Sequence, residues 1–158
     1  MCGRGDTCMS DRINYLEITE DIELSDGEIS DINVLLEQLS AKKIFCSRAW
    51  IEEVARSEVF VVAMSGAQIV GMATLCLVKN LSAGKLGYIH EVVVHTDFRR
   101  RGIMSALMEM LHCRAKDHEL DAIELTSDLG NEDRRKAIAG YLKMGYRQKD
   151  TGVFVYKF

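Results

Sequence analysis

The stretch YIHEVVVHTDFRRRGIMSAL, residues Tyr88–Leu107, decides the fold of this chain. It begins as a Val-rich run typical of a buried strand, passes through three arginines and a glycine, and ends in a helical pattern. A turn between a strand and a helix directs backbone N–H groups and the helix dipole at one place. Gly102 allows close approach or a positive φ, and the arginines add charge-assisted hydrogen bonds. The stretch therefore predicts a site for a phosphate or pyrophosphate.

The flanking segments predict an α+β fold with a mixed sheet. Ser25 and Glu28 have capping-box spacing, and Ser47 is placed to cap a second helix. A Ser-Gly-Ala turn at 65–67 predicts an antiparallel hairpin, and the strand-helix-strand order after it predicts one parallel step. Strands are expected at Ile13–Leu16, Val59–Met64, Ile69–Val78, Leu86–His95, Ala122–Thr126, Tyr146–Lys149 and Val153–Phe158. Helices are expected over 25–40, after Ser47, over 102–117 and over 132–144.

Composition limits the domain organisation and the kind of partner. With 158 residues, the chain is expected to form a flexible tail over 1–12 and a single domain over 13–158. The net charge of −4 argues against nucleic acid as a partner, whereas the local basic runs at 99–101 and 134–136 favour a compact anion. No apolar run predicts a membrane span or a signal peptide, so a cytoplasmic protein is expected. The five scattered cysteines predict free, mostly buried thiols, and no metal site is expected.

Sequence motifs limit which phosphate-containing ligand the turn is expected to bind. The dinucleotide fingerprint G-x-G-x-x-G and the nucleoside-triphosphate loop G-x-x-x-x-G-K-[ST] are both absent, which disfavours NAD and ATP. Residues Val92–Leu107 resemble the acetyl-CoA motif of the GCN5-related N-acetyltransferase (GNAT) family, [Q/R]-x-x-G-x-[G/A]. Arg99 and Gly102 match its first and fourth positions. Met104 departs from the motif at the sixth position, where the family has a small residue that admits the pyrophosphate.

The resemblance extends from about Ile13 to the C-terminus. Residues Tyr141–Tyr146, YLKMGY, are similar to the family's LYxKLGF segment. The runs Ile89–Val94 and Ile123–Ser127 resemble the small-substrate branch, in which I-E-D-V-V-V and L-T-S are frequent. A longer segment after L-T-S, and Ile138 where an Asn is frequent, depart from that pattern.

The resemblance implies a GNAT-type acyl-CoA N-acyltransferase fold with acetyl-CoA as co-substrate. Backbone groups of Val92 and Val94 would pair with the pantetheine, and the turn Arg99–Ser105 would hold the pyrophosphate. Arg134 would meet a coenzyme A phosphate, with a solvated helix face as the alternative. The full cofactor-binding set is Val92, Val93, Val94, Arg99, Arg100, Arg101, Gly102, Ile103, Met104, Ser105 and Arg134.

Three residues are candidates for acid–base chemistry. Tyr141 matches the tyrosine that donates a proton to the departing thiolate in the family; the alternative is a packing role. Glu91 and His90 are candidates for removing the proton from the amine. Strand alternation places them on opposite faces, so that only one, preferably Glu91, faces the acceptor. Both can instead be structural, with water removing the proton.

The function expected from the resemblance is N-acetyl transfer from acetyl-CoA to a primary amine of a small molecule or exposed peptide, by direct attack in a ternary complex. One alternative is a non-catalytic acyl-CoA-binding or sensing domain with the same fold. Another is acetylation of an amino sugar phosphate. Because many family members dimerise through their late strands, a homodimer stays open.

Overall fold

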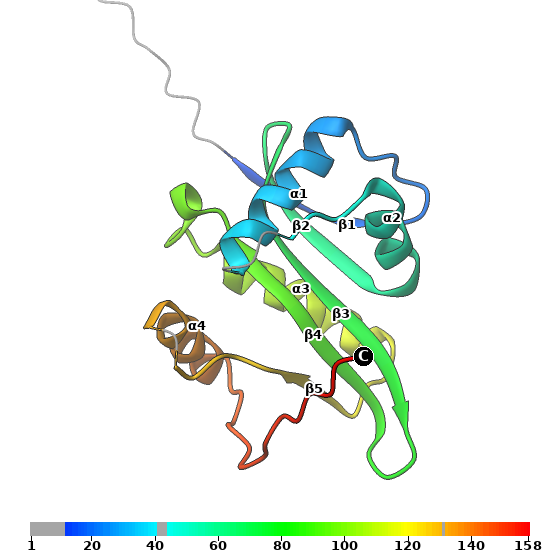
Figure 1. Ribbon diagram of the computed structural model, residues 1–158, viewed down its shortest axis with the longest axis vertical. Coiled ribbons are helices and arrows are strands. Elements are labelled where there is room, and N and C mark those ends of the chain that lie inside the picture. The colour runs from blue at the N-terminus through cyan, green and yellow to red at the C-terminus, as the bar shows by residue number, and fades with distance from the viewer. Residues whose placement is uncertain (1–11, 41–43, 131) are drawn as a thin grey trace, which may run out of the picture. The chain divides into compact units, whose positions relative to one another are not determined.

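The computed structural model describes residues 12–40, 44–130 and 132–158 (Figure 1). The chain forms two compact units, Met1–Leu125 and Thr126–Phe158, which are described separately. Apart from Arg12, the predicted tail over 1–12 lies outside the described residues. The prediction of a single domain over 13–158 stays a prediction.

The first unit contains a five-stranded sheet in the order β1-β2-β3-β4-β5. Neighbouring strands are antiparallel except for the parallel pair β4 and β5, which confirms the predicted mixed sheet with one parallel step. The strands are β1 (Ile13–Ile18), β2 (Val59–Ser65), β3 (Gln68–Asn80), β4 (Gly84–Val94) and β5 (Ala122–Leu125). The helices are α1 (Asp26–Leu39), α2 (Arg48–Ser57), the short 3-10 helix η1 (Thr96–Phe98) and α3 (Ile103–Asp117), with α4 (Glu132–Lys143) in the second unit.

Local sequence signals determine where the first two helices begin. Ser25 and Glu28 form the predicted capping box: Glu28 N–H donates to Ser25 Oγ (3.2 Å), and Ser25 N–H donates to Glu28 Oε2 (2.7 Å). Ser47 caps α2 by accepting from the N–H of Trp50 (3.3 Å). Donors that would otherwise be orphaned at these helix starts are thus satisfied locally, which is why the boundaries follow from the sequence.

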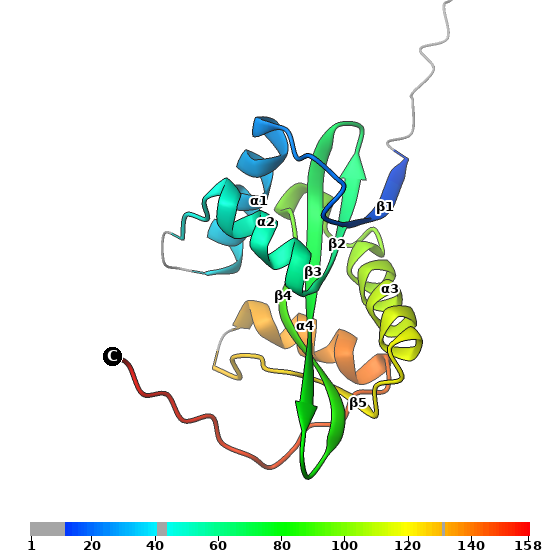
Figure 2. The ribbon, with the colours of Figure 1, turned by 90° about the vertical axis from the view of Figure 1, so that its right-hand side faces the viewer.

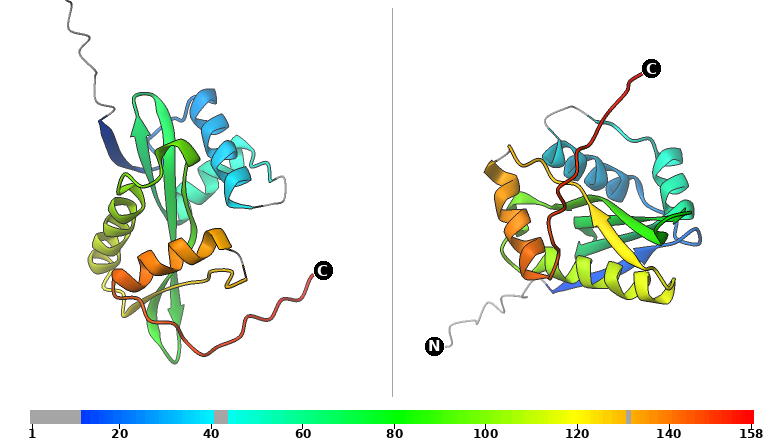
Figure 3. Two further views of the ribbon diagram at one scale, coloured as in Figure 1. Left: turned by 90° about the vertical axis from the view of Figure 1, so that its left-hand side faces the viewer. Right: turned by 90° about the horizontal axis from the view of Figure 1, so that it is seen from below.

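Helices cover both faces of the sheet in the first unit. Figures 2 and 3 show α1 and α2 on one face and α3 on the other. Gly71 of β3 permits the close approach of α3, because a Cβ there would lie 3.1 Å from Ile103 and 3.3 Å from Leu107. Burial of each large apolar side chain contributes roughly 1.5–3 kcal/mol. The core on the α1 and α2 face includes Ile32, Leu35, Phe60, Val62, Met72 and Val93, and α3 contributes Ile103, Leu107, Met108 and Leu111 to the opposite face.

The predicted strands at Tyr146–Lys149 and Val153–Phe158 are wrong. After α4 the chain runs without regular structure to its end, drawn in orange to red in Figure 3. The side chains of Val153, Phe154 and Phe158 are 74%, 96% and 116% exposed. A high β-propensity yields a strand only where a neighbouring strand completes the hydrogen bonds and covers one face. No such pairing forms within the described residues of the second unit.

The described residues contain no helix with both the length and the apolar character needed to cross a bilayer. The cysteines at 46, 76 and 113 are free thiols, as predicted. The prediction that the thiols are mostly buried is wrong for these three, because Cys46 and Cys76 are partly exposed and Cys113 is exposed. Cys2 and Cys8 lie outside the described residues.

Candidate functional site

A β-bulge in β4 determines how the two predicted proton acceptors are presented. The register between β3 and β4 shifts between Ala73 and Leu75, so that a single residue of β3, Thr74, lies opposite both His90 and Glu91. Two residues opposite one is the arrangement of a bulge, which interrupts the alternation of side chains. The prediction that His90 and Glu91 face opposite sides is therefore wrong, because both side chains project from the face covered by α1 and α2.

The bulge gathers polar side chains from two strands and one helix end. Thr74 Oγ1 donates a hydrogen bond to Glu91 Oε2 (2.6 Å). His90 Nδ1 lies 3.9 Å from Oε1 of Glu58, the residue that follows α2. Cys76 is two residues from Thr74 on β3, on the same face, and its thiol hydrogen-bonds to Glu58. We call these five residues the bulge cluster.

Burial and charge shift the acid–base behaviour of the bulge cluster. The Glu58 side chain is only 17% exposed, and this burial raises its pKa, to which the nearby negative charge of Glu91 adds. The nearby side chains of His90, Thr74 and Cys76 act in the opposite direction. Burial also raises the pKa of the Cys76 thiol, with Glu58 adding to the shift. His90 is 48% exposed and so connects the cluster with solvent.

The end of β4 extends beyond its parallel neighbour. Pairing with β5 ends where Ile89 lies opposite Leu125, whereas β4 continues through His90–Val94. Within the described residues of the first unit, this run has a strand partner on the β3 side only. Unpaired N–H and C=O groups along a strand edge can pair with an extended ligand as an added strand. This run includes the predicted pantetheine-pairing residues.

The turn after β4 has the backbone form of an anion site. Arg100 and Gly102 have positive φ angles of 64° and 77°, and Gly102 is the N-cap of α3. No side chain caps this helix, so the first-turn N–H groups of α3 remain available to a ligand. A Cβ at Gly102 would meet no atom within 4 Å, which leaves open space at the helix start. The turn therefore fits a diphosphate held by backbone donors.

The arginines of the turn are partly engaged within their own loop. Arg99 Nε donates to the carbonyl of Val94 (3.2 Å), and Arg101 Nη2 donates to the carbonyl of Asp97 (3.3 Å). The Arg101 guanidinium also lies 4.9 Å from the centre of the Phe98 ring. These contacts use only some of the five donors of each guanidinium, so the remaining N–H groups can meet a phosphate.

The second unit contains Tyr141 and Arg134, both on α4. Tyr141 is 8% exposed, and burial raises its pKa, while the positive charge of Arg134 acts in the opposite direction. The Tyr141 ring makes an edge contact with Tyr146, with ring centroids 5.9 Å apart. Burial, followed by the influence of Tyr141, raises the pKa of Tyr146 to about 12. Tyr141 is therefore a neutral phenol, able to donate a proton, throughout the physiological pH range.

A family model described as the acetyltransferase (GNAT) family matches residues 26–146. The chain belongs to the GNAT acetyltransferase family. No curated protein sequence matches it.

Solved structures of GNAT acetyltransferases share this fold. A Trypanosoma brucei acetyltransferase is 21% identical with a TM-score of 0.73, and the alignment covers 92% of this chain and 100% of that one. An aminoglycoside acetyltransferase from an uncultured soil sample is 20% identical with a TM-score of 0.74, covering 93% and 99%. Glucosamine-6-phosphate N-acetyltransferase from Arabidopsis thaliana is 21% identical with a TM-score of 0.70, covering 92% and 98%. At these identities the likeness shows the fold alone.

In this GNAT chain, the predicted cofactor residues of the first unit follow one another along the end of β4 and the turn. Their side chains are not equally available. Ile103 is 1% exposed and packs against β3, and Val93 is 5% exposed in the core, so each could meet a ligand only through its backbone. Met104 is half-buried in the first turn of α3, and Ser105 is exposed.

Sequence reasoning missed Glu58 and Thr74. Glu58 follows a helix and Thr74 lies in a strand of apolar residues, and neither position matches a motif. Only the register of β3 against β4 shows that Thr74 contacts Glu91 and that Glu58 lies beside His90. A bulge depends on pairing between distant segments, so no local signal could have identified it.

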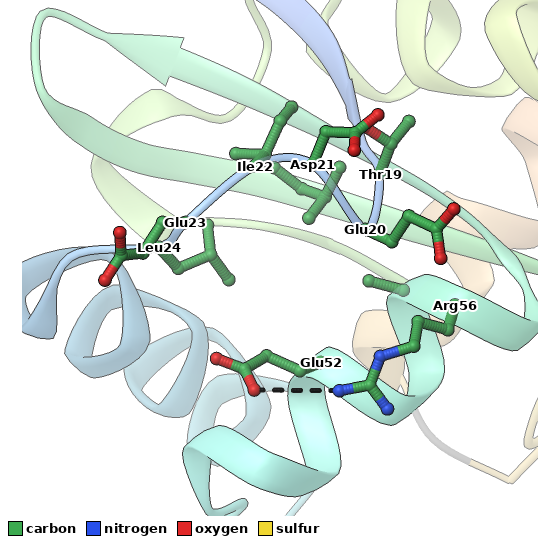
Figure 4. A pocket seen from close by; sticks show the side chains of 10 residues that line it. Thr19, Glu20, Asp21, Ile22, Glu23, Leu24, Glu52 and Arg56 are labelled. Atoms are coloured by element: carbon green, nitrogen blue, oxygen red, sulfur yellow. Dashed lines mark ion pairs between the residues drawn. The ribbon is translucent and has the colours of Figure 1, made fainter.

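Two hollows in the first unit lie away from the turn. One, of about 320 Å³, lies between the Thr19–Leu24 segment and α2 (Figure 4). Figure 4 shows Glu52 and Arg56 beside it, with an ion pair of 3.8 Å between them. The other, of about 620 Å³, runs between β1 and α3, where Arg114 pairs with Glu17 at 2.6 Å. Among the described residues, no group of three or more His, Cys, Asp or Glu is arranged to hold a metal ion.

Proposed function

We propose that this GNAT acetyltransferase transfers the acetyl group of acetyl-CoA to a primary amine of a small molecule or exposed peptide, by direct attack in a ternary complex. The observation that carries the proposal is the end of β4, His90–Val94, whose edge away from β3 has no strand partner within the described residues of the first unit. It leads through a left-handed turn into the uncapped start of α3. An extended chain ending in a diphosphate matches such a surface. Acetyl-CoA has that form.

The proposed coenzyme contacts follow from the backbone. Val92 and Val94 would offer N–H and C=O groups to the pantetheine, and Arg99–Ser105 would hold the diphosphate. Because these are mostly backbone donors, Met104 is compatible with binding if its side chain points away from the ligand. Arg134 is proposed to meet a coenzyme A phosphate. When bound, acetyl-CoA supplies an acetyl group activated as a thioester.

The proposed acid–base roles belong to three residues. The acceptor amine must lose a proton before or during attack, and both Glu91 and His90 are candidates to receive it, because the bulge presents them on one face. Tyr141, kept neutral by its raised pKa, is proposed to donate a proton to the departing sulfur. Each of these steps moves one proton between an acceptor and a donor, so the chain ends the reaction with its net charge unchanged.

Two other functions are alternatives. A non-catalytic acyl-CoA-binding domain is favoured by Met104, which stands where the family motif has a small residue. An amino sugar phosphate as acceptor is suggested by the resemblance of the runs Ile89–Val94 and Ile123–Ser127 to the small-substrate branch of the family. The bulge cluster argues against the second alternative, because its two carboxylates would repel a phosphate placed close to the reacting amine.

The first prediction is that the protein releases coenzyme A from acetyl-CoA in the presence of some primary amine. A panel of amino sugars, amino sugar phosphates, polyamines, amino acids and peptides, assayed by thiol release, tests it. Release above the amine-free background, with the acetylated amine seen by mass spectrometry, is the expected result. Binding of acetyl-CoA without release for every amine would instead favour the non-catalytic alternative.

A further inference from the structure

The backbone position of Glu58 places its side chain in the bulge cluster. It lies where α2 ends and β2 begins, and its N–H donates to the carbonyl of Val54 (2.8 Å) to close the helix. This bond fixes the backbone of Glu58 beside the sheet face from which His90 and Glu91 project. A glutamate with 17% exposure is unusual, because burial of a carboxylate is costly unless a partner compensates the charge. A functional role for the negative charge would explain why a carboxylate is partly buried at this position.

The partners of Glu58 do not neutralise it. From β4 it faces His90 and Glu91, and from β3 it faces Thr74 and Cys76. Within the described residues, no lysine or arginine forms an ion pair with either glutamate, and His90 is the one member of the cluster able to become a cation. The cluster therefore has more negative than positive charge, and it is poised to stabilise a positive charge that arises on His90 or arrives with a ligand.

The two glutamates are engaged differently. Glu91 accepts the Thr74 hydroxyl at 2.6 Å, which holds its carboxylate against β3. Glu58 instead lies 3.9 Å from Nδ1 of His90, longer than a hydrogen bond but within ion-pair distance once the imidazole is protonated. His90 is half-exposed, so Nε2 of the same ring is available to a second group. A general base is oriented when a carboxylate lies beside one nitrogen of its imidazole ring and the substrate amine lies at the other nitrogen.

We propose that Glu58 is a positioning residue of the acceptor site: it holds the Nδ1 side of His90, so that Nε2 takes the proton of the acceptor ammonium, and it stabilises the imidazolium that forms. This inference rests on the proposed function. The N–H bond of the ammonium breaks and an N–H bond forms at Nε2, while the amine keeps the electron pair for bonding to the acyl carbon. The imidazolium then loses its proton to water at its exposed side. Glu91 attracts the ammonium by its charge.

The kinetic test compares Glu58→Gln and Glu58→Asp with the matched control Glu52→Gln. Glu52 lies on α2, the helix that Glu58 follows, but it pairs with Arg48 and Arg56 outside the cluster. With the best acceptor of the amine panel, Glu58→Gln should lower kcat/KM for the amine by about tenfold or more, and leave KM for acetyl-CoA unchanged. Glu58→Asp should recover part of the loss, because it restores the charge, and Glu52→Gln should behave as the wild type.

A stability measurement separates positioning from a structural role. Since burial raises the pKa of Glu58, the folded state binds its proton more tightly than the unfolded state. Wild-type stability should therefore fall as pH rises from the ordinary glutamate pKa through the raised value. Below the ordinary glutamate pKa, Glu58 is protonated and neutral like glutamine, so Glu58→Gln and the wild type should have the same Tm. At neutral pH the Tm of Glu58→Gln should equal or exceed that of the wild type, because glutamine has no charge to bury. His90, Glu91 and Cys76 face position 58 in both proteins, so the difference between the two pH profiles reports the charge of Glu58 together with its interactions with these three groups.

The combined outcome decides between the possibilities. Lower activity with an unchanged or higher Tm supports the positioning role. Unchanged activity in Glu58→Gln overturns it, as does a parallel loss of activity and Tm at neutral pH that aspartate fails to restore. If the wild type acetylates no amine, the proposed function itself fails. That result is distinct from an active wild type with an equally active Glu58→Gln variant.

Discussion

Replacing Gly102 with valine should raise KM for acetyl-CoA by about tenfold or more, equivalent to a loss of about 1.4 kcal/mol of binding. Gly102 has φ 77° at the start of α3, in a space where a Cβ would meet no protein atom. If a diphosphate occupies that space, a β-branched side chain collides with it. The left-handed backbone also costs valine roughly 1–2 kcal/mol. Relief of this strain should shift the backbone at residue 102 and move the first N–H groups of α3.

Gly66→Val provides the matched control for this variant. Gly66 also has a positive φ, 59°, a Cβ there would likewise meet no atom within 4 Å, and it lies in the turn between β2 and β3. Both variants should therefore lose similar stability in urea denaturation, whereas only Gly102→Val should weaken acetyl-CoA. Equal KM values in the two variants would show that the turn before α3 does not hold the coenzyme.

Replacing Tyr141 with phenylalanine should lower kcat by about a hundredfold, with KM for acetyl-CoA changed by less than about threefold. The substitution removes the hydroxyl but keeps the ring and its burial. Because burial raises the pKa of Tyr141, the hydroxyl remains protonated through neutral and moderately alkaline pH. Deprotonation of Tyr141 should therefore not lower the wild-type kcat below about pH 10, which is the ordinary pKa of tyrosine. Steady-state kinetics across that pH range measure both effects.

Tyr146→Phe is the control for the loss of a phenol in the same ring pair. The two rings contact each other at 5.9 Å, and burial, with Tyr141 as a second cause, raises the pKa of Tyr146 to about 12. Both variants lose one hydroxyl from the same environment, so general disturbance of the pair should affect them alike. A similar fall in kcat for both would assign Tyr141 a packing role rather than proton donation.

The features that followed from the sequence are those determined within short segments. The capping box at Ser25, the cap at Ser47 and the turn before β3 depend on residues a few positions apart, and the structure confirms them. The strand-turn-helix of Tyr88–Leu107 was visible for the same reason. Gly102 was predicted to allow either a close approach or a positive φ, and its φ is 77°.

The features that the sequence did not predict depend on pairing between distant strands. Alternation alone assigned His90 and Glu91 to opposite faces, because nothing in the run Ile89–Val94 reveals that β3 is one residue short at Thr74. The same limitation led to the wrong strand prediction over Val153–Phe158, where β-propensity is high but no strand pairing forms. Both errors came from treating a strand as a local property.

Isothermal titration of acetyl-CoA tests the central claim most directly, namely that the end of β4 and the turn Arg99–Ser105 form the coenzyme site. We predict saturable one-to-one binding with a Kd between about 1 μM and 1 mM, the range common for enzyme substrates. Binding should be weakened in Gly102→Val and retained in Gly66→Val. Absence of binding to the wild type, or equal affinity in the two glycine variants, would contradict the account.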